Sequence, residues 1–186
     1  MTIRSGAAWV PKFPGSHSVD DLETAFQAKV QKFVHTLSSA GATVTVNATY
    51  RPPERAFLMH WAWEIVKQHV DAHHIPAMAG VDIDWWHGDQ AASEAAAQEM
   101  VDGYGLRNLG VAPALNSRHT ERKAIDMNLS WTGTLLIANA DGTTVTISSA
   151  PRDGTNGALI VVGATYGVIH FLHVSADRAH WSTDGH

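Results

Sequence analysis

Apolar side chains near the start of the chain recur at helical spacing. Five of them between Leu22 and Leu37 follow one another at intervals of three or four residues, so they share one face of a helix. Ser18 precedes this run as a capping residue, and Gly41 follows it as a terminator. The pattern predicts an amphipathic helix between these two residues.

Two further helices are expected in the first 105 residues. Pro53 suits the first turn of a helix, where no backbone N–H is lost, and the segment that it opens runs to about His74. The alanine-rich segment at 90–104 predicts a third helix, which Gly105 ends.

Alternating and β-branched residues predict strands, most of them late in the chain. Residues 43–50 alternate and stop at Arg51, which two prolines follow. Residues 81–86 also alternate, although their tryptophan pair equally suits the lining of a cleft. An Asp-Gly turn at 141–142 predicts a hairpin. The remaining expected elements are strands at 111–115, 124–131, 134–138, 145–147, from 168 and at 179–182, and a helix at 154–166.

Helices precede antiparallel strands in this order, which favours an α+β fold over a parallel doubly wound sheet. The length of 186 residues suits one domain with a sizeable core. Residues 1–17 are rich in Gly, Pro and Ser and predict an extended N-terminal arm. Residues 18–186 are expected to form a single compact domain, with N-terminal helices on a small, mainly antiparallel sheet.

Charge and composition exclude several classes of function. A formal net charge of -5 argues against a general nucleic-acid binder, which needs a basic face. The absence of cysteine excludes disulfides, a thiolate nucleophile and a Cys-type zinc site. No apolar run approaches the roughly 20 residues of a membrane span, so membrane insertion is not expected. The first residues lack the apolar stretch of a secretory signal, which predicts synthesis in the cytoplasm.

The 12 histidines direct attention to metal chemistry, because histidine is the commonest metal ligand. His119 and Asp126 bracket a charged turn and can meet as two ligands of a nitrogen and oxygen zinc site. His180 is a candidate third ligand, and Asp177, three residues before it, is placed to accept a proton from water. A His-x6-Asp pair with Ser117 and an alanine at their places arises by chance only about 0.007 times in such a chain.

Other assignments stay open on spacing alone. An aspartate three residues before a histidine also occurs at 71/74 and 84/87. His170, His173 and His87 compete with His180 for the third place. Each candidate also has an alternative that does not require catalysis. His119 and Asp126 would form a hydrogen-bonded surface pair, and Asp177 would cap a helix or turn. Arg51 would be a solvated turn residue, and the many histidines would serve a metal store.

The segment from Ser117 to Asp126 resembles the Ser-x-His-x-x-Gly-x-Ala-x-Asp signature of zinc D-alanyl-D-alanine carboxypeptidases and L-alanyl-D-glutamate endopeptidases. These are LAS-type metallopeptidases, which cut peptidoglycan stem peptides. Asp177-Arg-Ala-His180-Trp181 resembles the family's closing acidic residue, histidine and aromatic residue. Arg51 takes the place of a family arginine that lies between a strand and a helix.

The resemblance implies a role for each of these residues. His119, Asp126 and His180 would hold one Zn²⁺ per chain, and Asp177 would be the general base. The catalytic Arg51 would also bind the substrate or the developing oxyanion, and Ser117 would line the substrate cleft. The expected partner is a peptidoglycan peptide, cut at L-Ala-D-Glu or a nearby bond, or by D,D-carboxypeptidase action. The expected setting is the cell wall, reached through a holin or a dedicated secretion machine.

Two departures from the family pattern bear on this expectation. Arg122 stands where the family has Gly; at a positive φ it would strain the turn, and its charge would be able to project towards the cleft. That departure favours the alternative of a non-catalytic LAS-type module that binds a wall fragment or a protein partner. Asp177 replaces a glutamate of many members, and endopeptidase branches also use Asp, which favours an internal stem-peptide bond.

Overall fold

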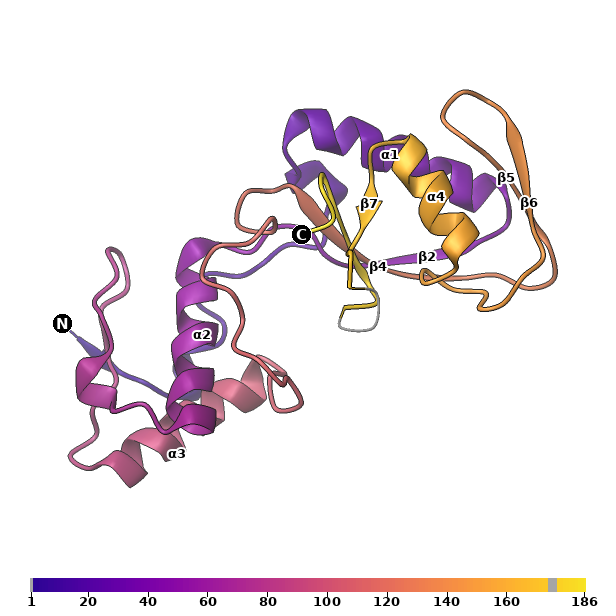
Figure 1. The fold of residues 1–186 in the computed structure, drawn as a ribbon. Helices are drawn as coiled ribbons and strands as arrows, with labels where there is room; N and C mark the ends of the chain where they lie inside the picture. The colour runs from indigo at the N-terminus through magenta and orange to yellow at the C-terminus, as the bar shows by residue number, and fades with distance from the viewer. Residues whose placement is uncertain (1, 174–176) are drawn as a thin grey trace. The chain divides into compact units, whose positions relative to one another are not determined.

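The structure is a computed structural model, and it describes residues 2–173 and 177–186. The described chain combines helices with mainly antiparallel strands, which confirms the α+β class (Figure 1). The sequence predicted one domain over residues 18–186. The contacts instead group the chain into two compact units. The first joins the residues up to Pro14 to Pro52–Asn116, and the second joins Gly15–Arg51 to Ser117–His186.

The first unit is built on two helices, α2 (Pro53–Gln68) and α3 (Gln90–Gly103). β1 (Ile3–Arg4) pairs in parallel with β3 (Ile83–Asp84). The segment expected as an extended arm therefore begins with a strand, and its 3-10 turn η1 (Ala7–Trp9) buries a tryptophan in the core of this unit. Burial of that indole gives the segment enough apolar contact to join the unit.

The helix α2 ends at Gln68, six residues before the predicted end at His74. His69 adopts a left-handed conformation with φ of 54°, and its N–H donates to Glu64. This closes the helix as a glycine C-cap does. Asp71 then caps the short 3-10 turn η3 (Ala72–His74). The strand predicted at 111–115 is wrong: the segment has no strand structure, its Val111 is 75% exposed, and Pro113 lacks the N–H that a strand ladder needs.

The second unit carries a four-stranded antiparallel sheet in the order β2–β4–β8–β7 (Figure 1). In register, Asp126 of the central strand β4 lies opposite Ala48 on one side and His180 on the other. The strands are β2 (Thr43–Ala48), β4 (Ala124–Ser130), β7 (Ile169–His170) and β8 (His180–Ser182). The predicted tail at 168–181 includes residues 174–176, which lie outside the described residues.

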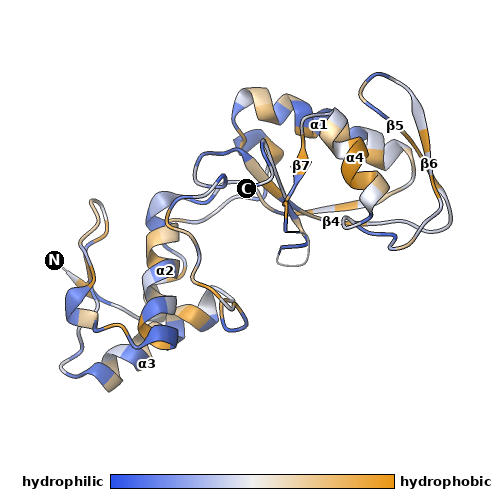
Figure 2. Cartoon of the chain, viewed as in Figure 1, coloured by the Kyte–Doolittle hydropathy of each residue, from blue (hydrophilic) through white to orange (hydrophobic). Residues whose placement is uncertain are grey.

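Two helices complete the core of the second unit. The helix α1 (Thr24–Ser39) buries the apolar stripe that the sequence predicted, but Glu23 caps it, while Ser18 caps the preceding 3-10 turn η2 (Val19–Asp21). The helix α4 (Gly157–Thr165) is apolar along most of its length (Figure 2). A Cβ at Gly163 would lie 2.6 Å from the ring of Trp181, so glycine lets α4 approach the strand that carries His180.

The predicted hairpin is confirmed as β5 (Leu135–Ala138) and β6 (Thr144–Ile147). Asp141 accepts a hydrogen bond from the N–H of Thr143, and Gly142 takes a φ of 88°, so both turn residues act as the pattern predicted. Within the described part of the chain, no helix has the combination of length and hydropathy that a bilayer span requires.

Candidate metal centre

Adjacent strands and one loop bring three candidate ligands together in the second unit. Asp126 and His180 are directly opposite partners of β4 and β8, so their side chains lie on the same face of the sheet. His119 lies in the loop before β4, where its backbone oxygen accepts a hydrogen bond from the N–H of Arg51, 3.2 Å away. The loop is thereby tied to the end of the segment that follows β2.

The ligand atoms of the triad form a nearly equilateral triangle. The Nε2 atom of His119 lies 3.1 Å from Oδ1 of Asp126 and 3.2 Å from Nδ1 of His180. The third side, between Nδ1 of His180 and Oδ1 of Asp126, is 3.2 Å. Ligand atoms bonded to one tetrahedral zinc at 2.0–2.1 Å are about 3.3 Å apart. The spacing of the triad is therefore compatible with a metal site.

The protonation of the ring nitrogens in the two imidazoles supports the same conclusion. The Nδ1 atom of His119 lies 2.9 Å from the backbone oxygen of Thr49, and Nε2 of His180 lies 3.0 Å from that of His186. A carbonyl oxygen can only accept, so both of these outer nitrogens carry the proton. In neutral rings the inner nitrogens then present lone pairs to each other and to Asp126. Such donation of the outer N–H to a carbonyl is the usual support of a metal-bound histidine.

The buried position of the two histidines and the charge of Asp126 favour a cation at the centre of the triad. His119 is 4% exposed and His180 is 7% exposed. Burial opposes ionisation of Asp126, but His119 and His180, which donate to the carboxylate once an inner ring nitrogen is protonated, outweigh it and hold the pKa of that carboxyl well below its usual range. Burial also disfavours a charged His180, yet the hydrogen bond and charge of Asp126 prevail and raise the pKa of that imidazole. A cation is stabilised here, whether it is a proton or a metal ion.

Of the three other predicted site residues, Ser117 and Asp177 lie within three residues of a candidate ligand along the chain, and Arg51 reaches His119 through the fold. Asp177 is exposed, accepts from the N–H of Ala179 at 3.3 Å, and contributes to the raised pKa of His180 by its charge. Ser117 has a buried hydroxyl with no hydrogen-bond partner among the residues that the structure describes. Arg51 is half-buried and meets His119 through its backbone. In the described chain, no hydrogen bond joins Asp177 or Ser117 to the side chains of the triad.

Arg122 stands where the peptidase signature that the segment resembles has glycine, and it has a positive φ of 62°. Its guanidinium carbon lies 3.6 Å from the centroid of the Tyr50 ring, and its Nη1 donates to the backbone oxygen of Asp21 at 2.8 Å. Its own carbonyl accepts from the N–H of Glu23. The strained backbone expected of a non-glycine residue is therefore present, and the charge is engaged with Tyr50 and Asp21.

The sequence reasoning missed the groups that orient the ligands. The oxygens of Thr49 and His186 belong to the backbone, so no residue type marks them. Arg118 is a further omission: its Nε lies 3.1 Å from both carboxylate oxygens of Asp184, and Nη2 contacts Oδ2. Its sequence signal is only the adjacency of Arg118 to His119.

The competing histidines lie elsewhere. Both ring nitrogens of His170 face backbone oxygens, at 3.0 and 3.1 Å, and His87 lies 3.0 Å from the hydroxyl of Ser5 in the first unit. His173 is exposed. Within the described ranges, the triad is the one group of three or more potential ligands at metal-binding distance. That single group does not favour a store for many metal ions.

Comparison of the chain with protein-family models, with curated proteins and with solved structures finds no match in any of the three. The buried His119–Asp126–His180 group is compatible with a metal site on its geometry alone.

Proposed function

We propose that this chain is a zinc-dependent peptidase that hydrolyses peptidoglycan stem peptides. The observation that carries the proposal is the convergence of three potential ligand atoms, one each from His119, Asp126 and His180, at separations of 3.1–3.2 Å. The joint sequence motif, which includes Arg51, Ser117 and Asp177, supports a peptidase over other metal chemistry.

The donor set suits zinc. Two imidazole nitrogens and one carboxylate oxygen are ligands that zinc accepts, and three protein ligands are typical of catalytic sites. A zinc ion held by these residues would polarise a scissile carbonyl and increase the nucleophilicity of water near neutral pH. The N–H groups that His119 and His180 donate to backbone oxygens would keep both rings oriented for this purpose.

Hydrolysis requires a group that carries a proton from water to the leaving amine. Asp177 has an exposed carboxylate close in sequence to His180, so it suits this role. Its carboxylate would accept the proton as the carbon–oxygen bond forms and would deliver it to the amine nitrogen as the carbon–nitrogen bond breaks. The products together contain the substrate plus one water.

Two further residues would contact the substrate. The guanidinium of Arg51 would balance the negative charge that develops on the scissile carbonyl oxygen, where a preorganised cation is most effective. The buried hydroxyl of Ser117 has no partner among the described residues, so a hydrogen bond to the substrate would satisfy it.

The cleaved bond and the setting follow from the same resemblance. Hydrolysis would occur at L-Ala-D-Glu or a nearby internal bond, with D,D-carboxypeptidase action as the alternative. The enzyme would reach the wall through a holin or a dedicated secretion machine.

The rival function is a LAS-type module that binds a wall fragment or a protein partner without catalysis. Arg122 was the feature in its favour. The contacts of that side chain with Tyr50 and Asp21 account for it without a role at the triad. The peptidase is therefore the better-supported proposal.

Zinc analysis and digestion of purified peptidoglycan test the proposal together. We expect one zinc per chain and a new amino terminus within the stem peptide, identified by mass spectrometry of the fragments. His119→Ala should lose both zinc and turnover, whereas His74→Ala, at an exposed histidine of the first unit, should retain both. A protein that binds no zinc, or a His119→Ala variant as active as wild type, would overturn the proposal. Full zinc occupancy without turnover would favour the binding module.

A further inference from the structure

One peptide unit connects the buried His170 to the exposed Asp177. This unit lies between Arg178 and Ala179. Its C=O lies 3.1 Å from Nε2 of His170, and its N–H donates to Oδ1 of Asp177 at 3.3 Å. His170 is only 2% exposed, whereas Asp177 lies on the surface. A chain of two hydrogen bonds therefore runs from a buried imidazole to the proposed general base.

The planarity of the peptide bond makes this connection directional. The bond between Arg178 and Ala179 is trans, so its C=O and its N–H point in opposite directions within one rigid plane. A donor that fixes the direction of the Arg178 oxygen therefore also fixes the direction of the Ala179 N–H. Hydrogen bonding at the oxygen also polarises the peptide, which strengthens the bond that its N–H makes. The orientation of the Asp177 carboxylate depends in this way on His170.

The ring of His170 is held in place by its own strand pair. His170 of β7 lies opposite Trp181 of β8, and the two rings meet edge to face with centroids 4.7 Å apart. Directly opposite residues share a face of the sheet, and neighbours along a strand alternate between faces. The His170 ring therefore lies on the face opposite to that of His180. From there it supports the site and does not compete for the metal.

The contact with Arg178 identifies Nε2 of His170 as a donor. A carbonyl oxygen only accepts, so this hydrogen bond requires the proton on Nε2. Among the described residues, no other donor is bonded to the Arg178 oxygen. Nδ1 of His170 lies 3.0 Å from the backbone oxygen of Phe171, and a second proton would be needed to satisfy that contact as well. The connection to Asp177 requires only the proton on Nε2.

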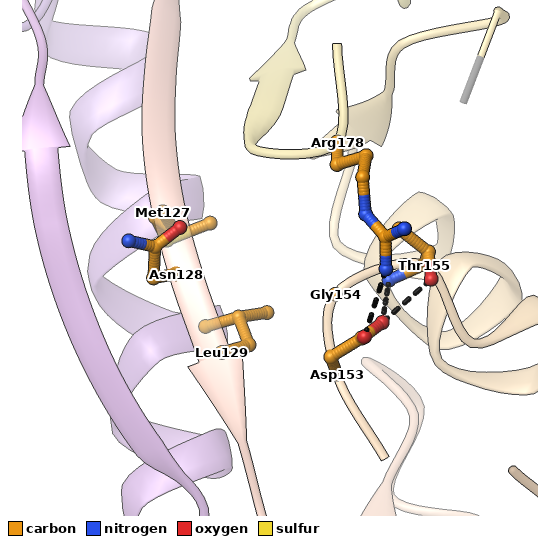
Figure 3. A pocket seen from close by; sticks show the side chains of 7 residues that line it. All are labelled: Met127, Asn128, Leu129, Asp153, Gly154, Thr155 and Arg178. Carbon is orange, nitrogen blue, oxygen red and sulfur yellow. Dashed lines mark hydrogen bonds and ion pairs between the residues drawn. The ribbon is translucent and has the colours of Figure 1, made fainter. Parts of the chain in front are cut away.

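The residues on both sides of the connecting peptide are anchored too. The guanidinium of Arg178 donates to Oδ2 of Asp153 at 3.0 Å (Figure 3). The C=O of Ala179 accepts from the N–H of Met127 on β4 at 2.8 Å. With these two positions held, rotation of the peptide plane between them is the freedom that remains, and the hydrogen bond from His170 restricts it.

We propose that His170 is a positioning residue, which orients the carboxylate of Asp177 through the peptide between Arg178 and Ala179. The inference rests on the proposed peptidase function and deepens it. With Oδ1 of Asp177 bound to the Ala179 N–H, Oδ2 remains to accept the proton of the attacking water. Loss of outer contacts that orient a working group typically costs about 10- to 100-fold in activity.

Asparagine and glutamine at residue 170 form a matched pair of variants. The amide nitrogen of glutamine stands the same number of bonds from Cα as Nε2 of histidine, whereas that of asparagine corresponds to Nδ1. Both substitutions lose the ring contact with Trp181, but only His170→Gln keeps a donor for the Arg178 oxygen. His60→Asn is the control, because Nδ1 of His60 lies 2.9 Å from the backbone oxygen of Pro113 in the first unit.

Turnover of stem peptides by the zinc-loaded variants measures the effect. His170→Asn should lower kcat about tenfold or more, with KM within about twofold and one zinc per chain, while His170→Gln and His60→Asn stay within about threefold of wild type. Added to Asp177→Asn, the His170→Asn change should cause no further loss, because residues that act as one unit are not additive. The same loss in the Gln and Asn variants, or the full loss in the Asp177→Asn background, would overturn the proposal.

NMR of the zinc-loaded protein tests the connection without catalysis. Nε2 of His170 should be protonated and should show a coupling across the hydrogen bond to the carbonyl carbon of Arg178. His170→Asn should shift the Ala179 amide proton, and His170→Gln should leave it near its wild-type position. An unprotonated Nε2 in the wild type overturns the proposal even where the variants do not fold.

The two experiments separate this inference from the proposed function. If the zinc-loaded wild type cuts no stem peptide but the NMR signals are as expected, the peptidase is wrong and the orientation of Asp177 by His170 stands. If the wild type cuts stem peptides and His170→Asn cuts them equally well, the positioning role is wrong and the peptidase stands.

Discussion

Arg118 and Asp184 form a bidentate ion pair that joins the loop of His119 to the turn after β8. In that turn the hydroxyl of Ser182 accepts from the N–H of His186, whose backbone oxygen faces His180. The ion pair therefore connects the loop that carries His119 to the turn that supports His180. Its distance from the metal position does not prevent it from affecting metal affinity, because ligand orientation depends on such outer contacts.

We predict that Asp184→Ala lowers zinc affinity about tenfold, because the turn that holds His186 loses its anchor. Competition with a chelator of known affinity measures the change. Asp102→Ala is the matched control, since Asp102 makes a comparable bidentate pair with Arg107 in the first unit. Equal zinc affinity in the Asp184 and Asp102 variants would show that the pair has no role in positioning the ligands.

Gly163 should be intolerant of even one added carbon. A Cβ there would lie 2.6 Å from the Trp181 ring and 3.0 Å from the oxygen of Val168. We expect Gly163→Ala to destabilise the protein by about 1–3 kcal/mol, as overpacking of a core does. Urea denaturation measures the loss. Gly157→Ala, at the start of the same helix with nothing within 4 Å, should be neutral or stabilising.

The strain at Arg122 can be separated from its contacts by two variants. Arg122→Ala loses the contact with Tyr50 and the hydrogen bond to Asp21 but keeps the positive φ. Arg122→Gly loses the same contacts and removes the strain, so it should be about 1 kcal/mol more stable than the alanine variant. Both should retain one zinc per chain. An alanine variant as stable as the glycine variant would mean that the backbone at residue 122 is not strained.

Zinc affinity and stability should depend on pH in a characteristic way. The pKa of His180 is raised above its ordinary value of 6.5, so protons compete with zinc as the pH falls through that raised value. Asp126 stays ionised throughout, because its pKa is lowered. The metal-free protein should show the opposite trend: protonated His180 stabilises the fold at low pH, and this contribution is lost as the pH rises through the raised pKa. Thermal denaturation of the zinc-loaded and metal-free proteins between pH 5 and pH 8 measures how the stability of each depends on pH. The same pH dependence in both forms would contradict His180 as a zinc ligand.

Asp177→Asn should separate catalysis from metal binding. The amide cannot accept a proton, so we expect turnover to fall about 10²- to 10⁴-fold while zinc stays at one per chain. Fragment analysis after peptidoglycan digestion gives the first quantity, and elemental analysis gives the second. Loss of zinc from this variant would make Asp177 a ligand instead of a base.

Local patterns predicted the elements that position the candidate site. The alternation at 43–50 and 124–131 predicted β2 and β4. The motif, with His119 and Asp126 seven residues apart, predicted that these two residues are ligands of one metal ion. The hairpin followed from its Asp-Gly turn. These features depend on periodicity and on residue types with strong conformational preferences, which a single sequence displays.

The sequence pattern did not predict long-range contacts or unusual backbone conformations. The burial of Trp9 with residues of α2 and α3 depends on contacts far apart in sequence, so the division into two units had no local signal. His69 ends α2 in a left-handed conformation. Glycine or asparagine at this position would have predicted the helix end, whereas histidine does not. The supports of the triad are backbone oxygens, which every residue possesses.

X-ray absorption at the zinc edge is the sharpest test of a metal centre at the triad, because it counts the imidazoles bound to the metal. We expect two imidazole nitrogens and an oxygen-only remainder, with bonds of about 2.0–2.1 Å. We also expect His180→Ala to remove one imidazole from the spectrum or to abolish zinc binding. A zinc spectrum without imidazole scattering, or one identical in wild type and His180→Ala, would contradict a metal centre at His119, Asp126 and His180.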